Sequence, residues 1–272
     1  MKYTLPRIVL TALSIGGAIA FLLPFYLMFV MSTENNAQIF AGLSLIPGTN
    51  LLRNFQGIGG FTYFRPFLNS IIVGASSVVL TVFFSAMAGF GIAKYNFKHK
   101  DVVFGLILAT LMVPPEIGII AYVTQMRIMH LNDTYLPLII PSMANAFGVF
   151  WMTGYMKNSI PAEILDSGKI DGCNDMGIFL RLVLPIIKPA LFTLSIVSFV
   201  QSWNNYMLPL VLINDPRRFT VPLAIAAVGT QFIPDYGARI LGITIGILPV
   251  FLIFLFTSKV VTKGLTEGAV KG

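Results

Sequence analysis

The sequence predicts an all-α, polytopic membrane protein, a helical bundle with about six transmembrane helices in a single domain that covers residues 1–272. Hydrophobic residues make up 56% of the chain and charged residues only 11%, whereas an average soluble domain has roughly 25% charged residues. The mean hydropathy is +0.82. These values exclude a water-soluble fold, because the chain has too few polar side chains to cover a surface in water.

Long apolar runs set the positions of the six spans. A helix rises about 1.5 Å per residue and therefore needs about 20 mostly apolar residues to cross the hydrocarbon core. Six runs with few or no charges have this length, at about 8–31, 67–93, 102–124, 135–156, 186–213 and 240–261. The first run is longer than the core of a signal peptide, which has about 7–15 residues, so we expect it to be retained as an anchor.

Lysine and arginine indicate the orientation. With the N-terminus in the cytoplasm, the inside segments hold twelve of the 18 basic residues, including every lysine. This bias is the one described by the positive-inside rule. We therefore expect both termini in the cytoplasm, with a cytoplasmic loop at 157–185, an extracytoplasmic loop at 214–239 and a cytoplasmic tail at 262–272. The same bias explains the net charge of +7, and the scattered basic residues do not indicate nucleic-acid binding.

The chain has few residues that could carry out catalysis. It contains one cysteine, Cys173, and two histidines, His99 and His130, which fall in predicted loops on opposite sides of the membrane. This argues against a metal site and against a membrane-embedded enzyme. An ion-coupled secondary transporter would normally show internal repeats and several buried ionisable groups, whereas only Glu116 lies deep in a predicted span. Beside two prolines, Glu116 is expected to meet freed backbone amides or a partner helix.

The inside loop has a pattern of its own. It contains four of the chain's eleven acidic residues and so cannot be a further span, namely Glu163, Asp166, Asp171 and Asp175. Ser159 can cap a helix in which Pro161 sits in the first turn, where a missing N–H costs nothing. Ile160, Ile164 and Gly168 would then form one row on a face of that helix. The row ends in a residue without a side chain, so another surface could approach closely there.

The second half of the loop predicts a turn and another helix. Asp171-Gly172 breaks the first helix, Asn174 or Asp175 can begin the next one, and Pro185 closes it before the following span. The product is a short cytoplasmic helix–turn–helix that stands on two membrane helices. On spacing alone, this element is either a solvated connector or a docking element.

The inside loop resembles the cytoplasmic motif of ABC importer permeases, in which Glu-Ala-Ala, three residues, Gly, nine residues and Ile-x-Leu-Pro form the coupling helix. Asp166-Ser167-Gly168 stands where Glu-Ala-Ala is usual, and Asp171-Gly172 matches the Asp-Gly pair. Phe179 and Leu184-Pro185 match the closing part, and Cys173 replaces a usual alanine.

Four further segments resemble the maltose-type carbohydrate family of these permeases, specifically the shorter of its two partner subunits. They are Phe67-Leu-Asn-Ser70, Val113-Pro-Pro-Glu116, Ser202-Trp-Asn-Asn-Tyr-Met-Leu-Pro209 and Gly264-Leu-Thr-Glu-Gly-Ala-Val-Lys-Gly272. Each segment is weak alone, but their order and spacing together are specific. The resemblance covers nearly the whole chain.

This resemblance implies a type I ABC importer permease fold in a prokaryotic cytoplasmic (inner) membrane. The chain would form, with a second and non-identical permease, the pathway for a sugar or oligosaccharide that a solute-binding protein delivers. A non-sugar cargo is the alternative within this class. No Gly-x-x-x-x-Gly-Lys-Ser/Thr phosphate loop occurs, so we expect no cofactor on this chain and place ATP and Mg on two partner ATP-binding subunits. The residues implied to dock there are Glu163, Ile164, Asp166, Ser167, Gly168, Asp171 and Gly172.

Two more sets of residues are candidates for contacts with the solute and its carrier. Polar side chains within spans are costly to bury unpaired, and amides beside an aromatic face suit a neutral polyhydroxyl solute. The pathway candidates are Asn145, Gln201, Trp203, Asn204 and Asn205, and the alternative is hydrogen bonding between helices. By resemblance, the outer loop meets the binding protein through Gln231, Phe232, Pro234, Asp235 and Tyr236, and the alternative is a plain proline-containing connector.

Overall fold

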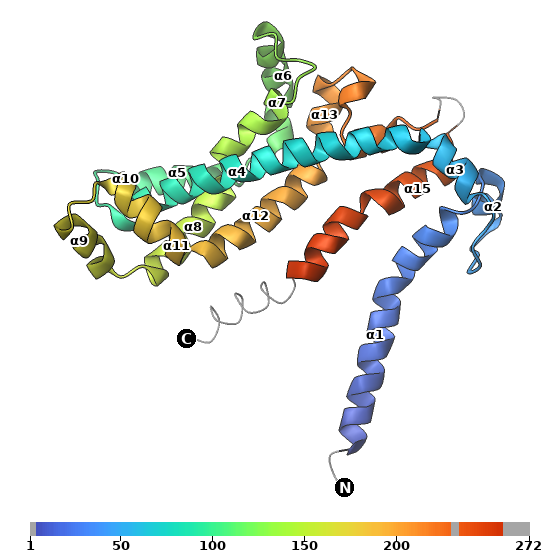
Figure 1. Ribbon diagram of the computed structural model, residues 1–272, viewed down its shortest axis with the longest axis horizontal. Coiled ribbons are helices and arrows are strands. Elements are labelled where there is room, and N and C mark those ends of the chain that lie inside the picture. Colours follow the sequence, from blue (N-terminus) through green and yellow to red (C-terminus); the bar gives the residue numbers. More distant parts are fainter. Residues whose placement is uncertain (1–3, 230–233, 258–272) are drawn as a thin grey trace. The chain divides into compact units, whose positions relative to one another are not determined.

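The computed structural model describes residues 4–229 and 234–257, and every regular element in these residues is helical (Figure 1). Four helices are long and apolar enough to cross a membrane, at Val9–Met31, Phe64–Lys94, Leu136–Ser159 and Tyr236–Thr257. Two bent helix pairs bring the total to six if each pair counts as one span. The described chain divides into two compact units.

The first unit comprises residues 4–65, 222–229 and 234–249. Its helices are α1 (Thr4–Met31), α2 (Asn36–Ala41), α3 (Leu51–Gly57), a 3-10 turn (Gly60–Tyr63) and α15 (Tyr236–Gly246), with α14 (Val221–Ala226) beginning at its border. The helix α15 packs against α1, α2 and α3. The side chains of α1 from Val9 onward are mostly exposed and apolar, which suits a helix surrounded by lipid or by partner helices.

A buried asparagine holds the first unit together. The side-chain amide of Asn54, which is fully buried, donates to the carbonyl oxygens of Ser32 and Glu34, each at 2.8 Å. These carbonyls follow the end of α1, where the last backbone oxygens have no partner within the helix. The backbone of Gly237 in α15 lies directly against the Glu34 carbonyl and Asn54, where a β-carbon would not fit.

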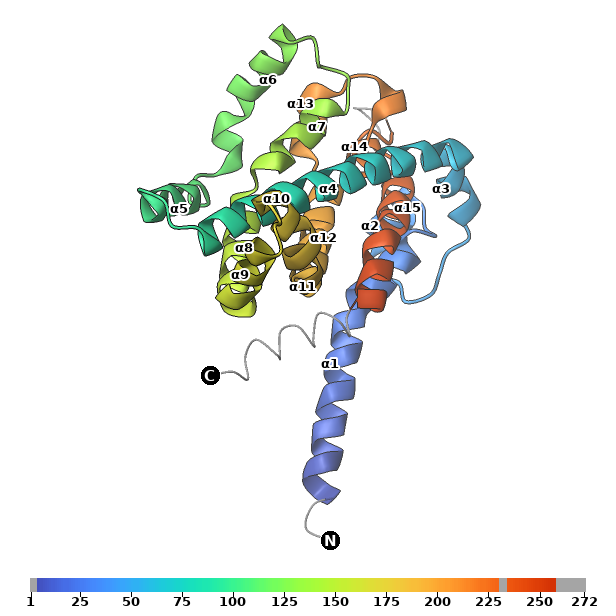
Figure 2. The ribbon, with the colours of Figure 1, turned by 60° about the vertical axis from the view of Figure 1, so that its left-hand side comes forward.

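The second unit comprises residues 66–221 and 250–257. Its α-helices are α4 (Phe64–Lys94), α5 (Lys100–Thr110), α6 (Ile119–Ile128), α7 (Leu136–Ile139), α8 (Ala146–Ser159), α9 (Ala162–Ile170), α10 (Asp175–Ile178), α11 (Leu184–Ile186), α12 (Lys188–Trp203) and α13 (Met207–Leu212). Short 3-10 turns lie at Pro115–Gly118, Ile140–Ala144 and Pro216–Arg218, and a π-helical segment lies at Phe179–Val183. Figure 2 shows α6, α7 and α13 grouped together, and α13 contacts both of the others.

Two of the predicted spans are not straight helices. In the span at 102–124, α5 ends at Thr110 and the chain bends by 87° before α6. The cause is Pro114-Pro115, because a proline disfavours helical geometry in the residue before it and cannot donate to the helical ladder. In the span at 186–213, α12 ends at Trp203 and α13 starts only at Met207. A second bend, of 81°, separates the stretch Asp175–Ile186 from α12.

The core of the second unit lies where α4, α8 and the chain from α10 to α12 meet. Its fully buried members include Met152, Met156, Ile178 and Phe179. Small residues let α4 and α8 approach closely, because a β-carbon on Gly89 would come within 2.8 Å of the Met152 β-carbon. The two helices that lead into and out of the inside loop are therefore packed on the same long helix.

Gly89→Leu tests this close approach. The added side chain has to push α8 away from α4, and overpacking of this kind costs about 1–3 kcal/mol. We expect a lower thermal unfolding midpoint of the detergent-solubilised protein, measured by size-exclusion chromatography after heating. The matched control is Gly154→Leu in α8, where a β-carbon meets nothing within 4 Å. Equal midpoints for the two variants would contradict the packing described here.

Candidate functional site

The first helix of the inside loop, α9, starts two residues later than its sequence suggests. Ser159 is the last residue of α8 rather than a helix cap, and Pro161 itself stands at the N-cap of α9 with φ −61° and ψ 149°. The proline forces the residue before it, Ile160, into an extended conformation. Ile160 is therefore not in one row with Ile164 and Gly168, and it is buried in the core instead.

The turn after α9 agrees with the prediction. The helix ends at Ile170, and Gly172 adopts a left-handed conformation with φ +76°. The amide of Gly172 donates to the Lys169 carbonyl at 3.0 Å, and that of Cys173 donates to the Gly168 carbonyl at 2.9 Å. This pair of bonds is the Schellman motif, which favours glycine at its left-handed position. The sequence Asp171-Gly172 thus ends the helix for a local reason.

The second helix of the loop begins at Asn174, one of the two predicted starts. The Asn174 side chain accepts a hydrogen bond from the Gly177 amide at 2.7 Å, which is an N-cap interaction. Pro185 does not close this helix, which continues to Ile186 through the π-helical segment. The wider turn makes room for the proline ring, which would otherwise clash with the carbonyl four residues earlier.

Gly168 allows a close approach, but the surface that approaches belongs to the loop itself. A β-carbon on Gly168 would lie 2.8 Å from the Leu182 side chain and 3.0 Å from that of Ile178. Gly168 is buried in the chain, whereas we expected it to face another protein. Its role in the structure is to let α9 pack on the helix that follows it.

The opposite face of α9 is exposed and carries the acidic side chains. Glu163 and Asp166 are exposed. Neither forms an ion pair in the described part of the chain, where the ion pairs are those of Asp215 with Arg217 and Arg218. At the end of α9, Ile170 is 86% exposed. An isoleucine so far out of the core at the tip of a helix is a candidate anchor for a partner. Ile170 was not among the residues predicted to dock, because it lies outside the apolar row of Ile164 and Gly168.

The comparisons with known proteins identify the family. A family model described as "Binding-protein-dependent transport system inner membrane component" matches residues 81–266, which is more than half of the chain. The chain belongs to this family. The predicted class, an ABC importer permease, is thereby confirmed, and the chain is a transport subunit with several membrane spans.

Two relatives and one solved structure match this transport component over most of its length. It is 33% identical to the arabinooligosaccharides transport system permease protein AraQ of Bacillus subtilis (strain 168), over 100% of this chain and 98% of AraQ. It is 29% identical to the sn-glycerol-3-phosphate transport system permease protein UgpE of Pectobacterium atrosepticum, over 93% of each chain. A chain of a bacterial ABC transporter involved in import of the acidic polysaccharide alginate has the same fold, with a TM-score of 0.76 and 21% identity over 94% of this chain and 96% of that one.

Some pathway candidates of this transport component have structural roles, and others are exposed. Trp203 is 3% exposed and stacks on Phe199 at 5.5 Å between ring centroids, so it packs the core and is not open to a solute. Asn145 caps α8 by accepting from the Gly148 amide at 2.7 Å. Gln201 and Asn204 are exposed, and they stay candidates.

A break in the fifth predicted span contains two of the candidates, Asn204 and Asn205. Asn204, Asn205 and Tyr206 lie between α12 and α13, and the Asn205 side chain accepts from the Leu208 amide at 3.3 Å. Irregular backbone at membrane depth is tolerated where it is covered by protein or lines a water-filled cavity. Glu116, in the other break, is exposed in this chain.

The outer candidates are partly described. Gln231 and Phe232 lie outside the described residues, as does the tail at 262–272. The Pro234 carbonyl accepts from the Asn36 side chain at 2.8 Å, and the Tyr236 amide donates to the Asn36 oxygen at 2.9 Å. The carboxylate of Asp235 caps α15 by accepting from the Ala238 amide at 3.1 Å. These three residues are thus fixed at the start of α15, and their contact with a binding protein stays a prediction.

A compensating pair of substitutions tests the packing of Gly168. Gly168→Met should push α9 away from Leu182 and lower transport activity, and Leu182→Ala in the same chain should restore part of it by vacating the space. The expected loss corresponds to overpacking by about 1–3 kcal/mol. Activity is measured as ATP-dependent solute uptake by membrane vesicles that contain the full transporter. No recovery in the double variant would show that Gly168 has a different neighbour in the working protein.

Proposed function

We propose that this chain is one of two non-identical permease subunits of an ABC importer for oligosaccharides. An extracytoplasmic binding protein delivers the solute, and two ATP-binding subunits on the cytoplasmic side drive transport. The observation that carries the proposal is the exposed acidic face of α9, which ends in Ile170, in a chain of the binding-protein-dependent family.

The partner subunits are inferred from what the chain lacks and from what it exposes. The sequence contains no phosphate-binding loop, so ATP hydrolysis requires another protein. Glu163 and Asp166 are available for basic residues of such a protein, and Ile170 is available for an apolar pocket. An anchor side chain that fills a desolvated pocket, within a ring of contacts that exclude water, is the usual arrangement of an interaction hot spot. We also propose that this face is cytoplasmic, that both termini lie in the cytoplasm, and that the chain lies in the inner membrane of a prokaryotic cell. The excess of lysine and arginine in the predicted inside segments supports this orientation.

The cargo is inferred from the relatives. AraQ is named for arabino-oligosaccharides, and the match to AraQ covers the whole chain. The exposed amides of Gln201 and Asn204 could donate to and accept from hydroxyl groups without requiring a charge. A neutral oligosaccharide therefore fits better than a charged solute.

The cargo is tested with the purified transporter and its binding protein. We expect arabinotriose to raise ATP hydrolysis above the basal rate, and we expect glycerol 3-phosphate to leave the basal rate unchanged. Stimulation by glycerol 3-phosphate alone would replace the oligosaccharide with a polyol phosphate and leave the permease role intact.

Ile170→Asp tests the docking face. A charge at the centre of an apolar contact should weaken association with the ATP-binding subunits by about 30-fold or more, which is the effect of losing one anchor residue. Association is measured by co-purification and by titrating the ATP-binding subunits onto the permease pair in nanodiscs. Ile170→Leu is the matched control and should bind normally. Normal association of Ile170→Asp, with normal amounts in the membrane, would contradict the proposal.

A further inference from the structure

The C-terminal end of α4 contacts the inside loop on both sides of α9. Lys94 is the last residue of α4, and its ammonium group donates to the Ile160 carbonyl at 2.6 Å and to the Lys157 carbonyl at 3.5 Å. Both carbonyls belong to the C-terminal end of α8, directly before α9. Carbonyls at a helix end have no partner in the helix, and a positive charge is favourable there.

The carbonyl to which Lys94 donates belongs to a residue that is held in the core. Ile160 is 2% exposed and belongs to the same core as Met156 and Phe90. Its carbonyl precedes Pro161, the N-cap of α9. The ammonium of Lys94 therefore fixes the chain at the point where it enters α9.

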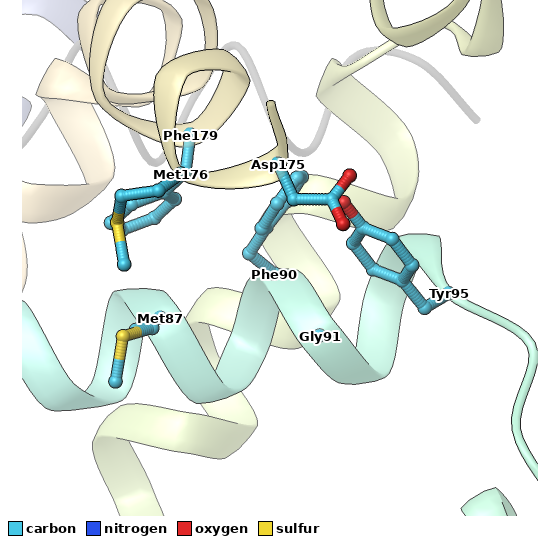
Figure 3. A pocket seen from close by; sticks show the side chains of 7 residues that line it. All are labelled: Met87, Phe90, Gly91, Tyr95, Asp175, Met176 and Phe179. Atoms are coloured by element: carbon cyan, nitrogen blue, oxygen red, sulfur yellow. The ribbon is translucent and has the colours of Figure 1, made fainter. Parts of the chain in front are cut away.

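The next residue, Tyr95, contacts the chain where it leaves the turn after α9. Its hydroxyl faces the carboxylate of Asp175, the first residue of α10 (Figure 3). Burial, followed by the hydrogen bond and the negative charge of Asp175, raises the pKa of Tyr95 to about 12. The Tyr95 ring packs edge-on against Phe90 of α4, with 5.3 Å between ring centroids.

The space beside this contact is not filled. A pocket of about 250 Å³ lies between the end of α4 and α10, with Met87, Phe90, Met176 and Phe179 among its walls and Tyr95 and Asp175 at one end (Figure 3). The polar contact between Tyr95 and Asp175 closes one end of this pocket.

The other end of α4 is tied to the loop that follows α13. The side-chain amide of Asn69 donates to the carbonyls of Arg217 at 3.0 Å and Phe219 at 2.9 Å. The Ser70 hydroxyl accepts from the Val221 amide at 2.8 Å. At 1.5 Å per residue, Asn69 and Lys94 lie about 37 Å apart along one helix. A single rigid element thus connects the inside loop with this distant segment.

We propose that Lys94 and Tyr95 are positioning residues that fix the chain directly before α9 and at the start of α10 to α4, so that movement of α9 is transmitted to α4 and is not absorbed within the loop. The inference rests on the proposed docking of the ATP-binding subunits at α9. In this proposal, Lys94 and Tyr95 do not contact the ATP-binding subunits. Their substitution should leave docking intact and separate it from transport.

The direct test measures the distance between α9 and the end of α4 in the assembled transporter. Spin labels are placed at Lys169 and Asn96, both exposed and neither among the predicted docking residues, in a background with Cys173→Ser. With Lys94 and Tyr95 intact, we expect a narrow distance distribution that ATP does not change. In the double variant Lys94→Met with Tyr95→Phe, the distribution should broaden and shift when ATP is added.

Transport measurements provide a second readout. Lys94→Met should lower arabinotriose uptake per ATP hydrolysed by about tenfold, which is the effect of losing a charge-assisted hydrogen bond. Lys94→Arg should restore most of the uptake, because a guanidinium group can also donate to two carbonyls. Lys98→Met, an exposed lysine in the same segment, is the control and should change nothing.

The outcomes separate this inference from the function on which it rests. Unchanged distances in the double variant, or an ATP-dependent distance with both residues intact, would overturn the inference while Ile170→Asp still blocks docking. Normal docking of Ile170→Asp would instead remove the proposed function. If Lys94→Met does not accumulate in the membrane, Tyr95→Phe, which keeps the ring, decides the matter through the same distance measurement.

Discussion

Each helix end in this protein leaves backbone carbonyls and amides without helical partners, and a chain with 11% charged residues has few side chains that can serve them. The positions where such side chains occur determine how the helices are joined. Asn54 serves the carbonyls after α1, and Asn69 serves those before α14. The ammonium of Lys94 serves those at the end of α8. These few polar contacts connect segments that are more than sixty residues apart in the second unit, and an apolar contact could not fix them with the same directionality.

The same requirement explains why the inside loop is a defined structure. Its two helices meet through a Schellman turn at Gly172 and an asparagine cap at Asn174, so both capping interactions of the turn are made within the chain. The loop can therefore be formed before any docking partner is bound. The exposed face is left with Glu163, Asp166 and Ile170, which have no structural task in the described chain.

The features that were predictable from the sequence are those with a local cause. The break at Asp171-Gly172 and the start at Asn174 follow from the conformational preferences of two or three residues, and the structure has both. The prediction of Ser159 as the N-cap was wrong. Pro161 disfavours helical geometry in the residue before it, so α9 begins beyond Ser159. The burial of Trp203 was not predictable, because it depends on Phe67 and Phe199, and Phe67 comes from a distant part of the chain. The neighbours of Gly168 were also not predictable, because a glycine on a helix face indicates that another segment packs closely there but does not identify that segment.

The bend between α5 and α6 has a consequence for how the subunit is made. Residues 111–118 are exposed in the single chain, and most of them are apolar. Non-helical backbone is not stable against lipid, so this stretch has to be covered by another protein or by water. A chain without such cover would expose an apolar, irregular segment in the middle of a membrane span. The stability of the folded chain in the membrane would then depend on what covers residues 111–118.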